Sequence, residues 1–68
     1  MNFLVELGRE EDGRWIAEVV EIPGALAYAS TGDEAVAKAK ALSLRVLADR
    51  LEHGEIGPDL GSVFFATT

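Results

Sequence analysis

The 68-residue sequence contains no cysteine, which excludes disulfide bonds and thiolate zinc sites as sources of stability. It contains one histidine, His53, so a histidine-based metal centre is not expected. No apolar run approaches the roughly 20 residues of a membrane-spanning helix. The first residues lead directly into a strand-like segment, so we expect no export signal and a cytoplasmic protein. Small domains without disulfides or metals usually need other support, so we expect association with a partner or a second copy.

Basic side chains are also scarce. Twelve Asp and Glu residues oppose six Lys and Arg residues, which gives a net charge of −6. Six of the acids lie within residues 1–24 beside only two arginines, whereas residues 31–53 are balanced. Such a surface repels phosphate backbones, so direct nucleic-acid binding is disfavoured and a basic protein partner is favoured. The alternative is that net negative charge only keeps a small protein soluble.

The sequence pattern predicts one α+β domain spanning residues 1–68. A hydrophobic content of 49% excludes intrinsic disorder, and the length leaves no room for a second domain. Turn signals separate short β-forming runs, and one long helical pattern precedes the last run. The expected order is therefore β-β-β-α-β, an antiparallel-rich sheet with one long helix packed on one face. The expected strands are 3–7, 15–20, 25–29 and 62–66, and the expected helix runs from its cap at Thr31 to about His53.

The faces of the first two strands decide the register of the first hairpin. A two-residue loop would place Leu7 opposite Glu18 and mix apolar with charged faces. A three-residue loop, residues 11–13, places Leu7 opposite Ala17 and puts Gly13 at the left-handed position that such loops need. We predict the second register, because a slip of one residue would turn a whole face over. Its core face carries Phe3, Val5, Leu7, Trp15, Ala17 and Val19.

The same register makes a prediction for the opposite face of the hairpin. Glu6 lies directly across from Glu18, and like charges in that position are destabilising. The register also sets Phe3 opposite Glu21. Leu4, Ile16 and Val20 surround the two glutamates, so this half-apolar, acidic face is a candidate docking surface; the alternative is an ordinary solvent-facing sheet. The residues expected to contact a partner are Glu6, Ile16, Glu18 and Val20.

The long helix has more apolar surface than one small sheet can cover. At roughly 21 residues it is about 32 Å long, against about 20 Å for six-residue strands, so it should overhang the sheet. Ala35, Val36, Ala39, Leu42 and Val46 form the stripe expected to face the sheet. A second stripe comprises Ala41, Leu44, Ala48 and Leu51, with Leu47 between the two. We expect a two-fold homodimer or a higher homo-oligomer, and the alternative is a partly exposed leucine stripe. The residues expected to mediate self-association are Leu44, Leu47 and Leu51.

Catalytic machinery is not expected. His53 follows Asp49 by four residues at the end of the helix and is interpreted as a surface residue. Glu6 and Glu18 would need a pocket that separates their pKa values before they could act as acid and base. No nucleophile elbow, phosphate-binding loop, dinucleotide fingerprint or metal-ligand spacing occurs. We therefore expect a non-enzymatic protein with no catalytic residue, cofactor or metal.

An ordered set of motifs carries a resemblance to a known family. The elements are Asp12-Gly13, the strand Trp15-Ile16-Ala17-Glu18-Val19, Pro23-Gly24, and Thr31-Gly32-Asp33-Glu34-Ala35. Over residues 3–42 the sequence resembles the HicB-like antitoxins, in a short form that has only their partial-RNase-H-like domain. The resemblance implies a β-β-β-α-β fold, homo-oligomers, and neutralisation of a small basic RNA-cleaving toxin of the HicA-like type.

The sequence also departs from that family. Full-length members carry a C-terminal DNA-binding module, for which this chain has no basic segment, and Ala29 stands where a glycine is frequent. We therefore expect no direct contact with nucleic acid. The alternative function is an orphan dimeric adaptor, or a small-ligand-binding module of the same fold, that has no toxin.

Overall fold

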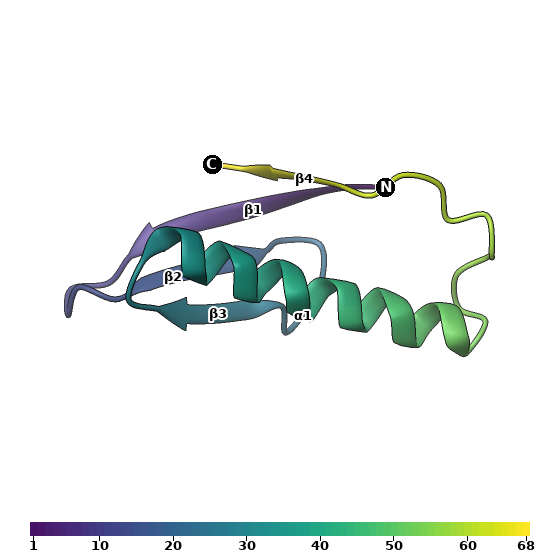
Figure 1. Cartoon of the computed structure of the whole chain (residues 1–68), viewed down its shortest axis with the longest axis horizontal. Helices are drawn as coiled ribbons and strands as arrows, with labels where there is room; N and C mark the ends of the chain where they lie inside the picture. Colours follow the sequence, from purple (N-terminus) through teal and green to yellow (C-terminus); the bar gives the residue numbers. More distant parts are fainter.

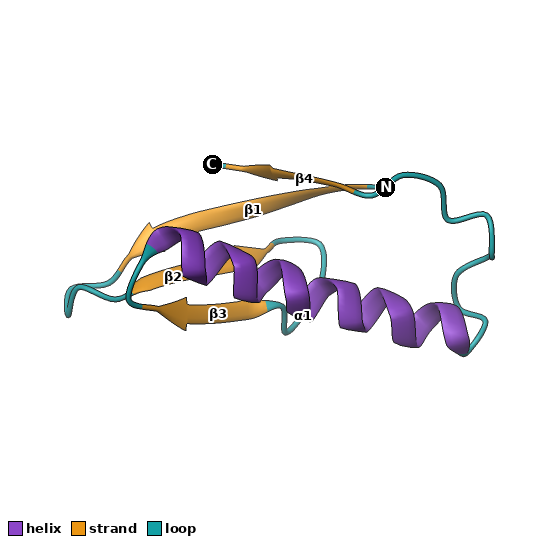
Figure 2. Cartoon of the chain, in the orientation of Figure 1, coloured by secondary structure: helices purple, strands orange, loops and turns teal.

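Four strands form one mixed sheet, and a single helix covers one of its faces (Figure 1). The computed structural model describes all residues, 1–68. The predicted α+β class and β-β-β-α-β order are confirmed, and the strands lie in the order β3-β2-β1-β4 across the sheet (Figure 2). The elements are β1 (Asn2–Arg9), β2 (Trp15–Val19), β3 (Leu26–Ala29), α1 (Gly32–Glu52) and β4 (Phe64–Thr67).

The hairpin of β1 and β2 has the predicted register. Leu7 pairs with Ala17, and Glu6 pairs with Glu18. The loop is closed where the Glu10 amide donates to the Arg14 carbonyl at 2.7 Å. Gly13 has a φ of 90°, the left-handed region where a side chain would be strained, so glycine is required at this position of the turn.

The pairing does not extend to Phe3 and Glu21, so that part of the prediction is wrong. β2 ends at residue 19 because the chain turns there to place Ile22 in the core, where it is only 1% exposed. The Glu21 carboxylate instead accepts hydrogen bonds from the Leu4 amide, at 2.9 and 3.3 Å. Phe3 pairs across to Phe65 of β4, and the two ring centroids are 5.6 Å apart.

The limits of α1 agree with the predicted start at Thr31 and the predicted end near His53. The Thr31 hydroxyl accepts a hydrogen bond from the Glu34 amide at 3.2 Å. The Glu34 carboxylate accepts from the Ser30 hydroxyl at 3.2 Å, and it also pairs with Lys38 at 3.7 Å. At the other end, Gly54 has a φ of 76° just past the last turn, a conformation that favours glycine after a helix.

Alanine provides most of the core between α1 and the sheet. Six of the ten buried apolar residues are alanines, so the helix can approach β2 and β3 closely. Larger apolar side chains are partly buried around this centre. Ser43 is completely buried in α1, and its hydroxyl donates to the Ala39 carbonyl at 2.9 Å, which satisfies the buried oxygen. The buried alanines are Ala17, Ala25, Ala27, Ala29, Ala35 and Ala39.

The predicted stripe of α1 lies against the core: Ala35 and Ala39 are completely buried, and Val36, Leu42 and Val46 are partly buried. The buried face also includes Ser43 and Leu47, which the prediction did not place there. The buried residues of α1 recur every four positions, at Ala35, Ala39, Ser43 and Leu47. Because 3.6 residues make one turn, this spacing drifts slowly around the helix and brings Leu47 onto the sheet. Leu47 is 4% exposed and belongs to the core, so its side chain is not available for the predicted self-association.

The last strand returns to the edge of the sheet beside β1. β4 pairs with β1 in parallel, with Asn2 opposite Phe64 and Leu4 opposite Ala66. The C-terminal end of α1 extends beyond β2 and β3, as predicted, and the chain then loops back to β4 (Figure 1). The longest dimension is 41 Å, and the radius of gyration is 12.8 Å against about 11 Å for a compact chain of this length. No helix of the chain is both long enough and apolar enough to cross a membrane.

Candidate functional site

The face of the sheet opposite α1 is covered by no other part of the chain (Figure 2). Because strand side chains alternate between faces, the residues on this side are those that flank the buried positions of each strand. We call them the outer face. Its members are Leu4, Glu6, Ile16, Glu18, Leu26, Tyr28, Phe64 and Ala66, together with Val20 just past the end of β2.

Two carboxylates occupy the centre of the outer face, and apolar side chains lie on either side. Strand pairing places Glu18 between Glu6 on β1 and Leu26 on β3. One pair further along, Ile16 lies beside Tyr28. Several apolar members are well exposed, Leu26 by 38%, Tyr28 by 41% and Phe64 by 63%, whereas Leu4 and Ile16 are half-buried. This arrangement leaves a contiguous apolar surface with a negative centre in contact with water.

No cation neutralises the two central glutamates. Neither Glu6 nor Glu18 takes part in any salt bridge of the structure. Arg14 reaches the outer face, where its guanidinium carbon lies 4.6 Å from the centre of the Tyr28 ring. That arginine already pairs with Asp12 at 2.7 Å. The outer face is therefore acidic, and its negative charge remains available to a partner.

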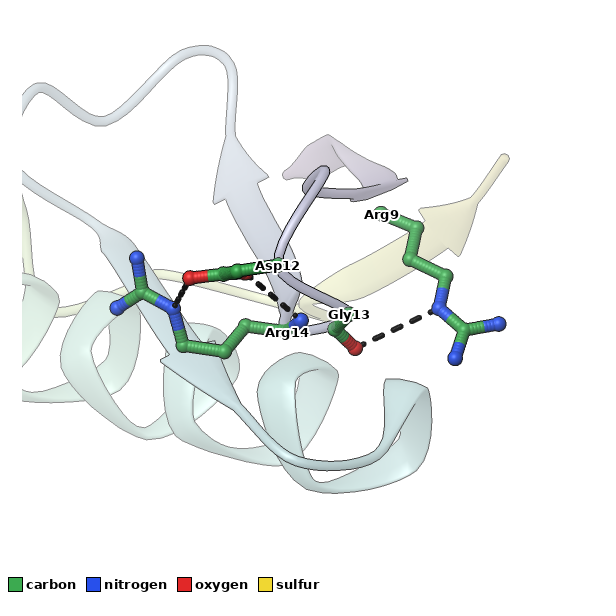
Figure 3. A network of polar contacts seen from close by, with 4 residues as sticks. All are labelled: Arg9, Asp12, Gly13 and Arg14. Atoms are coloured by element: carbon green, nitrogen blue, oxygen red, sulfur yellow. Dashed lines mark hydrogen bonds and ion pairs between the residues drawn. The ribbon is translucent and has the colours of Figure 1, made fainter.

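A polar network braces the hairpin turn beside the outer face (Figure 3). Asp12 accepts from the Arg14 amide at 3.0 Å and from the Arg14 Nε at 2.7 Å. The Arg9 Nε donates to the Gly13 carbonyl at 3.4 Å, and its guanidinium carbon lies 5.3 Å from the Trp15 ring. The two arginines thus stack on aromatic rings on opposite faces of the sheet. Hydrogen bonds from the Arg14 amide and then from its side chain lower the pKa of Asp12.

Acid is expected to loosen this turn. The pKa of Asp12 is lower in the folded chain than its ordinary value of 3.8, so its stabilising effect is complete above that value and is lost as the pH falls through the lowered pKa. The amide resonance of Arg14 should shift in acid with a midpoint below 3.8, and Asp12→Asn should abolish that step. A midpoint at or above 3.8 in the wild type would contradict the hydrogen bonds between Arg14 and the Asp12 carboxylate.

The structure brings the predicted partner-binding residues to one surface. Glu6, Ile16 and Glu18 are neighbours on the outer face, and Val20 follows at its end, 50% exposed. Leu26, Tyr28 and Phe64 also lie on this surface and were not among the predicted contacts. The signal for the first two is the strict alternation from Ala25 to Ala29, in which the alanines point inward and the larger residues point outward. Phe64 joins the surface through pairing between β1 and β4, which no local pattern indicates.

The groove between α1 and β1 and the single histidine are weaker candidates for a functional site than the outer face. A groove of about 470 Å³ lies between α1 and β1, but it is open to solvent and lacks the enclosure typical of ligand sites. His53 contacts only its own helix end, where its Nδ1 lies 2.8 Å from the Asp49 carbonyl. No cluster of three or more potential metal ligands occurs. The residues lining the groove are Leu7, Asp33, Val36, Ala37, Lys40 and Thr67.

Comparisons with protein-family models, curated proteins and solved structures found no match to this chain.

Proposed function

We propose that the outer face binds a small basic protein, and that the chain is a non-enzymatic, HicB-like antitoxin that neutralises a HicA-like RNA-cleaving toxin. The observation that carries the proposal is the opposition of Glu6 and Glu18, without a cation, at the centre of an exposed apolar surface. The motifs that resemble the HicB-like family supply the class of partner.

Repulsion between the two opposed carboxylates destabilises the free protein, and a basic partner would relieve this repulsion. Like charges directly across two antiparallel strands are destabilising. A lysine or arginine placed between Glu6 and Glu18 would remove this repulsion and gain charge-assisted hydrogen bonds to both carboxylates. The surrounding apolar side chains would be buried in the same event, which adds affinity that charge alone does not supply.

The same contact accounts for inhibition of an RNA-cleaving enzyme. A protein that binds RNA needs a basic surface to contact the phosphates. An acidic face that covers this surface excludes RNA by competing for the same cations. The antitoxin therefore needs no catalytic group, and complementary charge would also speed the encounter of the two proteins.

The proposal is tested by calorimetric titration of the chain against the small basic protein encoded beside its gene, followed by an RNA-cleavage assay of the mixture. We expect tight binding that weakens with added salt, together with loss of cleavage. Glu18→Lys should weaken this binding. Glu55→Lys is its matched control, because it makes the same charge change in the loop after α1, outside the outer face. Absence of binding would overturn the proposal and favour the orphan adaptor or small-ligand module.

A further inference from the structure

The face of α1 that points away from the sheet carries a seam with coiled-coil spacing. Its apolar residues are separated by alternating steps of four and three positions, which is the heptad pattern that holds two helices together. The two leucines of the seam are 50% and 39% exposed, so a large part of each side chain remains in contact with water. The seam residues are Ala37, Ala41, Leu44, Ala48 and Leu51.

Charge favours a second copy of this chain as the occupant of the seam. The residues of α1 include four acids and four bases, so the helix is neutral, and the rest of the chain carries the whole net charge of −6. Two copies that met through their outer faces would bring Glu6 and Glu18 against the same residues of the other copy. Two copies that meet through α1 avoid this repulsion.

We infer that the protein forms a homodimer in which α1 packs against α1 of a second copy in the antiparallel direction. In this arrangement Leu44 lies against Ala48 of the second copy, and Ala41 lies against its Leu51. Each layer of the seam then combines one large and one small side chain. This pairing allows the helices to approach closely without leaving a void between them.

The charges that flank the seam select both the direction and the register. Lys38 and Glu52 each follow a seam residue directly, and the antiparallel register places Lys38 beside Glu52 of the second copy at two symmetric points. A shift by one heptad would instead place Lys38 beside Arg45, and a parallel pair would place Lys40 beside Arg45. At the two-fold axis Arg45 lies near Arg45 of the second copy. This is one unfavourable contact, against the two favourable contacts between Lys38 and Glu52.

This dimer is independent of the proposed antitoxin role, because α1 and the outer face lie on opposite sides of the sheet (Figure 1). Pairing through α1 leaves both outer faces directed away from the interface. One dimer would therefore present two identical binding surfaces. Loss of dimer formation should leave partner binding by the outer face intact, and loss of partner binding should leave the dimer intact.

The oligomeric state is tested by light scattering coupled to size-exclusion chromatography. The wild type should have twice the 7.3 kDa mass of one chain, and Leu44→Asp should have the mass of one chain. Val20→Asp is the matched control, because Val20 is also 50% exposed but lies at the end of the outer face. It should remain dimeric. Circular dichroism verifies that both variants fold; a monomeric wild type, or a folded Leu44→Asp that stays dimeric, would overturn the inference.

The direction of the helices is tested by a distance between two spin labels. The chain has no cysteine, so Asp33→Cys provides one labelling site near the start of α1. Residue 33 lies 13 positions from the two-fold centre of the proposed register, so the labelled positions should be about 39 Å apart along the helix at 1.5 Å per residue. A parallel dimer would bring them within about 10 Å, the usual spacing of packed helices, and that result would refute the antiparallel arrangement.

Discussion

Reversal of the two opposed glutamates, Glu6→Lys with Glu18→Lys, is expected to weaken binding of a basic partner by about 30-fold or more, or about 2 kcal/mol, without unfolding the protein. Both side chains point into solvent on the outer face, so lysine fits at either position. The double variant still opposes two like charges, so its free energy of unfolding should stay close to that of the wild type.

The single variant Glu18→Lys separates binding from stability. It places a lysine opposite Glu6, so the destabilising pair becomes a favourable one and the free energy of unfolding should rise by roughly 0.2–1 kcal/mol. Binding of the partner should nevertheless weaken. Urea unfolding followed by circular dichroism measures stability, and calorimetry measures affinity. Unchanged affinity in both variants would show that the partner binds elsewhere.

Truncation of Ile22 is expected to have the largest effect on stability. Ile22 is 1% exposed and is one of the largest fully buried side chains of the protein, although it lies in a turn and not in a strand. Ile22→Ala should lower the free energy of unfolding by about 2–5 kcal/mol, because it removes buried methylene groups and leaves a cavity. For a domain this small such a loss is a large share of the total stability.

Val20→Ala is the control for this experiment. Val20 is two residues away and 50% exposed, so its truncation should change stability by no more than about 0.5 kcal/mol. Both variants are unfolded in urea at one fixed protein concentration, because the midpoint of a dimer depends on concentration. If Ile22→Ala and Val20→Ala unfold at the same urea concentration, the turn does not anchor the core as the structure indicates.

The hairpin and the limits of the helix could be predicted from the sequence because both depend on local rules. Loop length and the two-residue period of strands leave one register in which Leu7 meets Ala17. That register also places Glu6 across from Glu18, so the centre of the candidate site was predictable. Capping by Thr31 likewise involves residues only three positions apart.

The features of the fold that could not be predicted from the sequence depend on contacts between segments that are distant along the chain. Ile22 leaves the strand pattern because the core needs an apolar side chain at the end of β2, and the Glu21 carboxylate then serves as the acceptor for Leu4. Ser43 and Leu47 face the sheet because of the way α1 lies on it, and residue type alone does not specify that orientation.

The sequence by itself thus determined the order of the elements, the hairpin register and the acidic pair, since each follows from neighbours along the chain. Only the tertiary structure decided that β4 lies parallel to β1 and adds Phe64 to the outer face. It also decided which leucines of α1 remain exposed: Leu44 and Leu51 do, and Leu47 does not. The physical reason is that pairing between the two ends of a chain, and the angle of a helix on a sheet, depend on how all the side chains pack together.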